Sequence, residues 1–173
     1  MDYYDIVLNT CKIEDGLESR LGFKKMFMTG RDVGLFEVDS PKVKNAAGGI
    51  IIGANKGKLF ACARGEVKAV VISDSRIDKK LIEWMAGNGI VLCMPMSAIT
   101  ASFGIDRAKI IYLMEKLFSY AKKSGVHVSF VTLAGSNLYL SSIEQLVELA
   151  KLVGADEQYA RYSIGSINRT LIR

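Results

Sequence analysis

Histidine is nearly missing from this chain, which has His127 alone among its 173 residues. A two-metal phosphoesterase needs several histidine and carboxylate ligands to hold its ions and to acidify a bound water. A Ser-His-Asp or Cys-His mechanism would depend on the same single imidazole, and no G-x-S-x-G motif accompanies it. His127 also begins a strand-like run instead of ending one, so we interpret it as a partly buried structural residue. The scarcity of histidine argues against both kinds of hydrolase.

Cysteine is scarce as well, and Cys11, Cys62 and Cys93 stand singly in apolar surroundings with no C-x-x-C pair. Zinc and redox sites use such pairs, so we expect three reduced core residues. The glycines have neither the spacing of a P-loop nor that of a G-x-G-x-x-G fingerprint. We therefore predict no catalytic residue and no metal ligand in this chain.

Long hydrophobic runs are also missing, since the longest, such as residues 89–96 and 128–134, fall short of the ~20 residues that cross a bilayer. Asp2 and Asp5 stand where a signal peptide would carry basic residues. We expect a cytoplasmic protein with no membrane partner. Half of the residues are hydrophobic and no linker is visible, so we predict a single domain over residues 1–173.

The charges are present but unevenly distributed. Residues 2–39 carry eight acidic and five basic side chains, whereas residues 42–68 carry six basic side chains and Glu66 alone. A basic stretch beside an acidic one is typical either of an ordinary solvated surface or of a surface for an anionic partner.

Short apolar runs alternate with helix signals from residue 67 onward, which predicts parallel strands covered by helices. The predicted strands cover residues 5–9, 24–28, 34–38, 49–54, 58–63, 67–72, 90–96 and 128–133. The predicted helices cover residues 13–21, 77–86, 106–123, 142–153 and 157–162. The strands over 49–54 and 58–63 resemble a hairpin, and Ser75 and Asp78 have capping-box-like spacing.

In parallel α/β folds the ligand-binding residues gather where the strands end. Here the residues after each predicted strand are small and polar, with hardly a carboxylate. They are 9–10, 29–31, 73–76, 97–98, 135–137 and, after the last helix, 163–166. Such ends favour a site that contacts a partner over one that performs its own chemistry.

The helix predicted over 106–123 has an apolar face and a second face with lysines at seven-residue steps. Lys109, Lys116 and Lys123 alternate there with Tyr112 and Tyr120. Lysines neutralise phosphates and tyrosines stack on unpaired bases, so this face suits irregular or single-stranded RNA. Exposed lysines are also common on any solvated helix face.

Arg107 lies in the first turn of that helix, where a cation faces the positive end of the helix dipole. An arriving phosphate would offset this cost by meeting both the backbone N–H groups and the guanidinium. A salt bridge to Asp106 or Asp74 is the structural alternative.

The segments 67–99 and 106–172 resemble the archaeal ribonuclease P protein component 3 family, which is related to a thirty-kilodalton human subunit. The similarity lies in spacing and residue type and covers roughly 60% of the chain. The matching stretches are residues 70–73, 77–81, 88–92, the Arg107 helix with its Lys122-Lys123 end, residues 128–134, and the closing pattern Leu146, Leu149, Leu152, Gly154, Ala160 and 163–172. Tyr3-Tyr4-Asp5 also resembles the family's opening.

The resemblance implies a TIM-barrel-like (PHP-related) α/β fold without the metal site of the related phosphoesterases, reduced or irregular in its first half. It implies a noncatalytic subunit of ribonuclease P, the ribonucleoprotein endonuclease that removes 5′ leaders from precursor tRNA. Its partners would be the catalytic RNA and protein component 2, and a dimer of heterodimers is left open. The chemistry and its Mg²⁺ would belong to the RNA, so this chain needs no cofactor.

We expect eight basic side chains to contact RNA phosphates: Arg76, Arg107, Lys109, Lys116, Lys122, Lys123, Arg161 and Arg169. Two other functions remain open. One is a phosphoesterase of the related barrel family that uses Asp74 with one metal ion, and the other is a scaffold whose apolar surface docks a partner protein.

Overall fold

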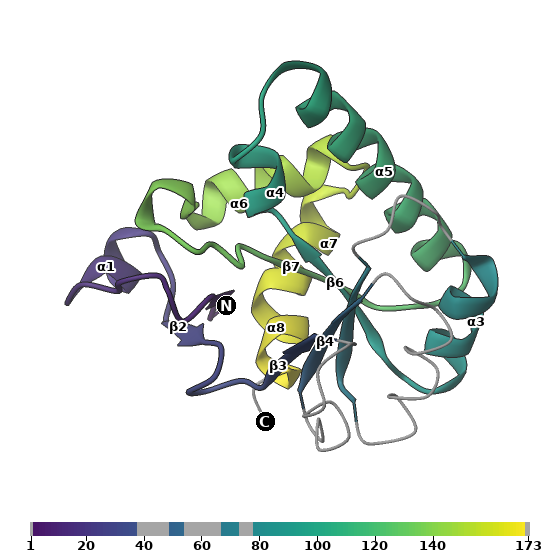
Figure 1. Ribbon diagram of the computed structural model, residues 1–173, viewed down its shortest axis with the longest axis horizontal. Coiled ribbons are helices and arrows are strands. Elements are labelled where there is room, and N and C mark those ends of the chain that lie inside the picture. The colour runs from purple at the N-terminus through teal and green to yellow at the C-terminus, as the bar shows by residue number, and fades with distance from the viewer. Residues whose placement is uncertain (1, 38–48, 54–66, 73–77, 172–173) are drawn as a thin grey trace.

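The computed structural model describes residues 2–37, 49–53, 67–72 and 78–171. In these ranges the strands are β1 (Tyr4–Val7), β2 (Lys25–Met28), β3 (Leu35–Glu37), β4 (Ile50–Gly53), β5 (Ala69–Ile72), β6 (Val91–Pro95) and β7 (Val128–Val131). The helices are α1 (Leu17–Arg20), α3 (Lys79–Gly87), α4 (Ser97–Thr100), α5 (Gly104–Lys123), α6 (Ile143–Leu152), α7 (Glu157–Tyr162) and α8 (Asn168–Thr170). A 3-10 turn, η2 (Asn137–Tyr139), precedes α6, and a π-helical turn, η3 (Ser163–Ile167), joins α7 to α8 (Figure 1).

All the strand pairs are parallel. β1 pairs with β2, and β3 to β7 form a five-stranded sheet in chain order. Parallel neighbours need crossover connections, and α3 and α5 supply those between β5, β6 and β7. The expected α/β architecture with parallel strands and covering helices is confirmed.

Backbone contacts join the pair β1–β2 to the five-stranded sheet on two sides. A parallel bridge pairs Thr29, after β2, with Val33, before β3. On the other side, Leu133 N donates to Ile6 O at 2.8 Å, and Leu8 N donates to Ala134 O at 3.0 Å. The chain beyond β7 thus continues as a partner of β1.

The core lies on both faces of the five-stranded sheet because successive strand residues point to opposite sides. Leu92 and Met94 of β6 belong to a large cluster that includes apolar residues of α3, α5, α6 and α7. Val91 and Cys93 belong to a second cluster of small aliphatic side chains from the strands, closed by Ile167 and Leu171. Burial on both faces explains why β5 is apolar throughout.

The edge of β7 that faces away from β6 pairs with side chains of the helical segment 157–170. Tyr159 Oη and Ser163 Oγ each accept a hydrogen bond from a β7 amide at 2.9 Å, and Ser163 Oγ donates to a β7 carbonyl at 2.8 Å. Asn168 Nδ2 donates to Phe130 O at 2.8 Å and to Tyr4 O at 2.9 Å. A helix therefore occupies the space between the first part of β1 and β7, and its polar side chains satisfy the strand edge.

Polar residues begin three of the helices. Asp78 accepts from Lys80 N at 3.0 Å at the start of α3, and Asp156 accepts from Tyr159 N at 2.7 Å at the start of α7. Ser142 and Gln145 form a reciprocal capping box at the start of α6.

Several sequence predictions need correction. The hairpin of residues 49–54 with 58–63 is wrong as a pairing, because both edges of β4 are occupied by β3 and β5; residues 58–63 themselves lie outside the described ranges. His127 lies before β7 as predicted, but it is exposed instead of partly buried. The helix predicted over 13–21 is observed only as Leu17–Arg20. Asp78 is the N-cap residue of α3 and not its third residue, as a capping box with Ser75 would require; Ser75 lies outside the described residues.

Candidate nucleic-acid interface

The polar residues at the carboxyl ends of the strands are engaged with one another and with the backbone. Thr10 Oγ1 donates to Gly135 O at 3.0 Å, and Cys11 Sγ donates to Asn137 Oδ1 at 3.1 Å. Within the described residues, no three His, Cys, Asp or Glu side chains gather where they could hold a metal ion. Residues 73–76, with Asp74 and Arg76, lie outside the described ranges. These contacts make the described ends a structural junction.

Asp5 is the one charged side chain in the described core. Its Oδ1 accepts from Ile6 N at 2.8 Å and from Thr132 N at 2.7 Å, and its Oδ2 accepts from the Thr132 hydroxyl. Burial raises the pKa of Asp5 to about 6, and these three hydrogen bonds oppose the rise. The carboxylate thus ties β1 to the edge of β7.

The two described cysteines are free and buried, as expected. Burial raises the pKa of Cys93 to about 12, which keeps the thiol protonated and unreactive at neutral pH. Burial also raises the pKa of Cys11. Cys62 lies outside the described residues.

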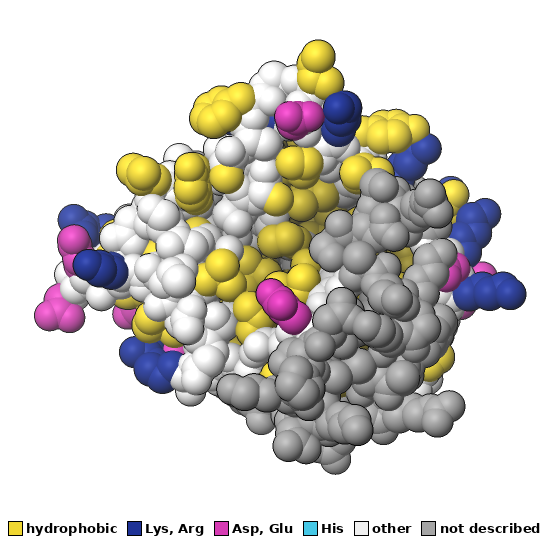
Figure 2. Space-filling model, viewed as in Figure 1, with side chains coloured by type: hydrophobic (Ala, Val, Ile, Leu, Met, Phe, Trp, Pro, Cys, Tyr) yellow, Lys and Arg dark blue, Asp and Glu magenta, His cyan; other side chains and the backbone are white. Residues whose placement is uncertain are grey.

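The lysine-tyrosine stripe comprises Lys109, Tyr112, Lys116, Tyr120 and Lys123 on the outer face of α5. Lys116 Nζ lies 4.4 Å from the centre of the Tyr112 ring, and contact with the Tyr112 hydroxyl raises the pKa of Lys116. Tyr120 is half-buried against the large core cluster, and Nζ of Lys79 from α3 lies over its ring, 5.3 Å from the centre. Lys and Arg side chains gather along the edge of the molecule where α5 and α3 lie (Figure 2). The stripe is a continuous cationic and aromatic surface.

Arg107 is held at the start of α5 without an ion pair to Asp106. Its Nε donates to Ser102 O at 2.7 Å, and its guanidinium lies 5.3 Å from the centre of the Phe103 ring. Asp106 instead contacts Lys109, at 3.4 Å between exposed atoms. The positive charge of Arg107 is therefore left without a carboxylate partner within the described part of the chain.

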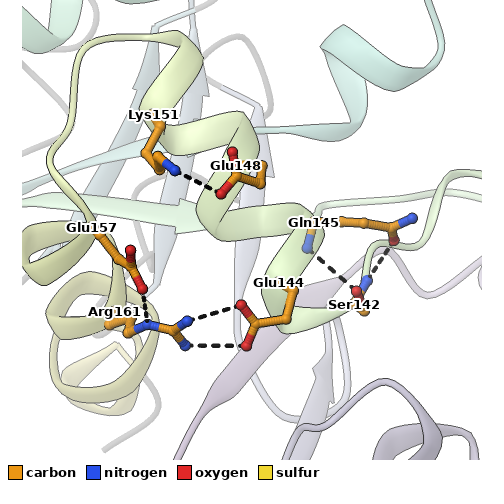
Figure 3. Close-up of polar contacts among 7 residues, drawn as sticks. All are labelled: Ser142, Glu144, Gln145, Glu148, Lys151, Glu157 and Arg161. Carbon is orange, nitrogen blue, oxygen red and sulfur yellow. Dashed lines mark hydrogen bonds and ion pairs between the residues drawn. The ribbon is translucent and has the colours of Figure 1, made fainter.

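Arg161 differs from the other predicted phosphate contacts because two carboxylates already bind it. Its NH1 and NH2 donate to Glu144 of α6 at 3.2 and 2.8 Å, and its Nε donates to Glu157 at 3.0 Å (Figure 3). The Glu144 contact is the largest cause that raises the pKa of Arg161, followed by contacts with Tyr3 and Glu157. The charge of Arg161 is largely neutralised within the protein.

Lys122, Lys123 and Arg169 are exposed. Lys122 Nζ lies 3.9 Å from Asp156 Oδ2, a weak contact between side chains that are each more than half exposed. Arg169, on α8, lies near Asp2 and Lys24, whose ion pair spans 2.6 Å. Their side chains remain accessible to a ligand.

The predicted contacts do not converge on one point. Arg107 and Lys122 lie near opposite ends of a 20-residue helix, about 30 Å long. Lys122 and Arg161 come together on one side of the molecule, around a hollow of about 640 Å³. Three tyrosines that sequence reasoning did not assign to the site also line it: Tyr3, Tyr159 and Tyr162. In the sequence, the closeness of Tyr159 and Tyr162 to Arg161 was the one feature that could have indicated an aromatic and cationic site here.

Large apolar side chains are exposed at the opposite end of α5 and near α6. Phe103 and Ile105 are 74% and 75% exposed, and Leu138 is 86% exposed. A groove of about 500 Å³ between α4, η2 and α6 contains Leu138, Leu149 and Leu152. Hydrophobic side chains are seen over these elements in the space-filling view (Figure 2). None of the helices in the described ranges has the length and hydrophobicity needed to cross a membrane.

No family model and no curated protein matches this chain. Among solved structures, a chain from the cryo-EM structure of an archaeal ribonuclease P with mature tRNA is similar, with a TM-score of 0.68 and 13% identity. That similarity covers 96% of this chain and 80% of the other. The chain is thus similar in fold, over nearly its whole length, to one found in a ribonuclease P complex.

Two further crystal structures share the fold less closely. An uncharacterized protein has a TM-score of 0.55 at 14% identity, with 78% of this chain covered. A prolidase complexed with N-methylphosphonate-L-proline has a TM-score of 0.53 at 11% identity, with 90% covered. This chain spans only 36% and 44% of those two proteins.

Proposed function

We propose that this protein is a noncatalytic subunit of ribonuclease P that binds and stabilises the catalytic RNA which cleaves 5′ leaders from precursor tRNA. The observation that carries the proposal is the similarity in fold along 96% of the chain to a chain of an archaeal ribonuclease P complex. The lysine-tyrosine stripe supports it, because lysines neutralise phosphates and tyrosines stack on the unpaired bases of irregular or single-stranded RNA.

The fold proposed for this subunit is a reduced TIM-barrel-like wall. The parallel strands and the bonds from the end of β1 to residues 133–134 support closure between β1 and β7, and the bridge between Thr29 and Val33 supports continuity from β2 to β3. The helical segment 157–170 takes the position of a missing strand beside β7. In such a fold the apolar face of α5 packs on the sheet, so the lysine-tyrosine stripe faces outward to a partner.

Phosphate contacts are proposed for the accessible cations Arg107, Lys109, Lys116, Lys123 and Arg169, and for Lys122. Arg107 is well suited because no carboxylate in the described ranges competes for it. Arg161 is less suited, since Glu144 and Glu157 occupy its donors. Arg76, outside the described residues, remains a prediction.

The proposed partners are ribonuclease P RNA and protein component 2. The Mg²⁺ of the reaction is proposed to belong to the RNA. The chain itself is proposed to need no cofactor.

The decisive test is cleavage of precursor tRNA by ribonuclease P RNA with component 2, in the presence and absence of this protein, with a protein-only control. Restored cleavage at moderate magnesium, and none from the protein alone, is expected. Cleavage by the protein alone would favour a metal-dependent phosphoesterase, and tight divalent binding in calorimetry would then be required.

A protein-docking scaffold is the second candidate, and the exposed side chains of Phe103, Ile105 and Leu138 favour it. A scaffold would not need an RNA-binding surface. It predicts weak and uniform RNA affinity even at low salt, together with no restored cleavage when the protein is added.

A further inference from the structure

The hollow between the start of β1, the end of α5 and α7, here called the tyrosine basin, has a distinct composition. Its lining is Tyr3, Lys122, Asp156, Gln158, Tyr159, Arg161 and Tyr162. Three aromatic rings with two cations in a hollow of about 640 Å³ are more than a solvated surface requires. The basin lies away from the lysine-tyrosine stripe, because Lys122 projects toward Asp156 and α7.

The aromatic wall of the basin is fixed by the core. The Tyr159 ring packs edge-on against Phe118 and Phe130, with centres 5.6 and 6.5 Å apart, and its hydroxyl accepts from Val128 N at 2.9 Å. Tyr162 packs edge-on against Tyr159 at 6.3 Å and remains 42% exposed. The Tyr162 ring is thus held in place by Tyr159 on one side and is open to solvent on the other. A base could stack on it with little further loss of side-chain entropy.

The cations of the basin have different roles. The in-plane donors of Arg161 are engaged by Glu144 and Glu157, so its planar faces, not its edges, are left for a ligand (Figure 3). Lys122 is 60% exposed, and its contact with Asp156 is long, so its ammonium group can turn to a phosphate. Because carboxylates already bind Arg161, Lys122 is the cation of the basin that is open to a phosphate.

We propose that the tyrosine basin binds one unpaired nucleotide of the partner RNA, with the base stacked on Tyr162 and the adjoining phosphate at Lys122. This inference rests on the proposed function and deepens it, because it adds a base-stacking site to a surface of phosphate contacts. Arg161 then acts as a positioning residue that orients the base. Asp156 and Gln158 stand at the rim, where a carboxylate and an amide can accept the N–H groups of a base edge.

The test uses the full chain and two probes, a fluorescein-labelled octauridylate and an RNA hairpin without unpaired bases outside its tight loop. Tyr162→Ala is expected to weaken octauridylate binding about tenfold, the loss of one base–aromatic stack, and to leave hairpin binding unchanged. Tyr162→Phe keeps the ring and is expected to bind as the wild type does. Tyr139→Ala, a half-exposed tyrosine outside the basin, is the matched control and is expected to change neither probe.

A second measurement needs no variant. Octauridylate with a central 4-thiouridine is expected to crosslink under ultraviolet light to the peptide that contains Tyr162 or to that with Tyr3, as read by mass spectrometry. Lys122→Glu should weaken the same crosslink and reduce the salt dependence of binding by about one phosphate contact.

The outcomes separate the basin from the proposed function. Unchanged octauridylate binding by Tyr162→Ala, with crosslinks elsewhere, overturns the basin while restored precursor-tRNA cleavage keeps the function. No binding of either RNA at low salt overturns both. Displacement of octauridylate by micromolar free uridine monophosphate overturns an RNA ligand and assigns the basin to a free nucleotide.

Discussion

Between β1 and the residues after β7, the side chain of Asp5 accepts hydrogen bonds that a backbone carbonyl would accept in a regular β-sheet. Its oxygens accept from the amides of Ile6 and Thr132 and from the Thr132 hydroxyl, all within the core. Because burial outweighs these bonds, the pKa of Asp5 is raised to about 6, and the protonated form is favoured in the folded state. Ionisation of Asp5 therefore costs the folded state free energy because the charge is buried, although the hydrogen bonds from Ile6 and Thr132 favour the ionised form.

Asp5→Asn is expected to remove a pH dependence of stability. The raised pKa means that the folded state binds the proton more tightly than the unfolded state, so the stabilising contribution is complete below about pH 4 and is lost as the pH rises through about 6. Relative to Asp5→Asn, the wild type should lose roughly 3 kcal/mol of unfolding free energy between these limits. Urea unfolding from about pH 4 to about pH 7 measures the difference.

Asp32→Asn is the matched control, because Asp32 has the opposite shift. Its ion pair with Arg31 at 2.9 Å is the main cause that lowers its pKa, so its contribution is present at neutral pH and is lost on acidification. The two variants should change the pH profile in opposite directions. Parallel profiles for the wild type and Asp5→Asn would contradict the role given to Asp5.

At the scale of single residues, sequence reasoning found exposed cations but could not identify their partners. Glu157 stands four residues before Arg161, a spacing that predicts a helical ion pair. Glu144 lies on another helix, and only the packing of α6 against α7 brings it to Arg161. The alternative ion pair between Arg107 and Asp106 is not formed, and Asp74 lies outside the described residues. A backbone carbonyl and an aromatic ring contact Arg107 instead, and charge patterns reveal neither.

At the scale of elements, the segment 157–170 is helical, yet its side chains bond to the edge of β7 where a neighbouring strand would otherwise pair. Its first part was predicted over 157–162, but its continuation through a π turn was not. The turn begins at Ser163, whose hydroxyl serves both a β7 amide and a β7 carbonyl. In this arrangement one polar side chain of the helix bonds to two backbone groups of the strand. The hydrophobic periodicity of the segment does not indicate such contacts.

Asn168→Ala is expected to destabilise the protein by about 2 to 4 kcal/mol, since it leaves buried carbonyls of Tyr4 and Phe130 without a donor. Asn168→Asp preserves the size but removes the donors, and it should cost at least as much at neutral pH. Arg169→Ala, at the exposed position next in the chain, should stay within about 0.5 kcal/mol. Denaturant unfolding checks all three, and a small loss for both Asn168 variants would contradict the assignment.

The capping box of α6 gives a smaller and local prediction. Ser142→Ala removes the acceptor for Gln145 N and should cost about 1 kcal/mol, or a few degrees in melting temperature. Ser142→Asp retains an acceptor and should remain close to the wild type. Circular dichroism during heating measures both; equal melting temperatures would exclude a capping contribution.

The periodic elements could be predicted because their signals are local. The helix expected over 106–123 is observed as Gly104–Lys123, and the strand expected over 67–72 as Ala69–Ile72. The hairpin failed because adjacent strand signals do not specify their partners. β4 takes β3 and β5 as parallel neighbours, and only crossovers elsewhere in the chain make that pairing accessible.

At the scale of the whole molecule, the net charge of +5 matters through its placement. The stripe on α5 presents Lys109, Lys116 and Lys123 along one helix, and Lys109 has a contact of 3.4 Å with the exposed Asp106. Arg161 and Lys151 are paired with carboxylates at 2.8 and 2.7 Å. The parallel α/β class and its helical covering could be predicted from alternation alone. The position of Arg161 beside the Lys122 end of α5 could not be predicted, because it depends on how α7 packs.

Reversing the three stripe lysines to glutamate should reduce the dependence of RNA affinity on salt. Each lost phosphate contact lowers the slope of log affinity against log salt by about 0.7 to 0.9, so the triple variant should lose about two to three units. Fluorescence anisotropy over a salt series measures the slope. The same reversal at Lys12, Lys25 and Lys151 changes the net charge equally and should lower the slope less; equal loss would reduce the stripe to a net-charge effect.

The contact between Asn168 and Tyr4 joins residues 164 positions apart in the chain. A ribosome makes β1 early, and the side chain that occupies its edge emerges only after all of the other strands. Residues 132–134 bond to the second half of that edge first, and Asn168 then occupies its start. Until residue 132 is made, β1 has β2 as its strand partner and its other edge open. The vulnerability of the nascent protein to misassembly should therefore be greatest before translation reaches residue 132, and it should end only when Asn168 is in place.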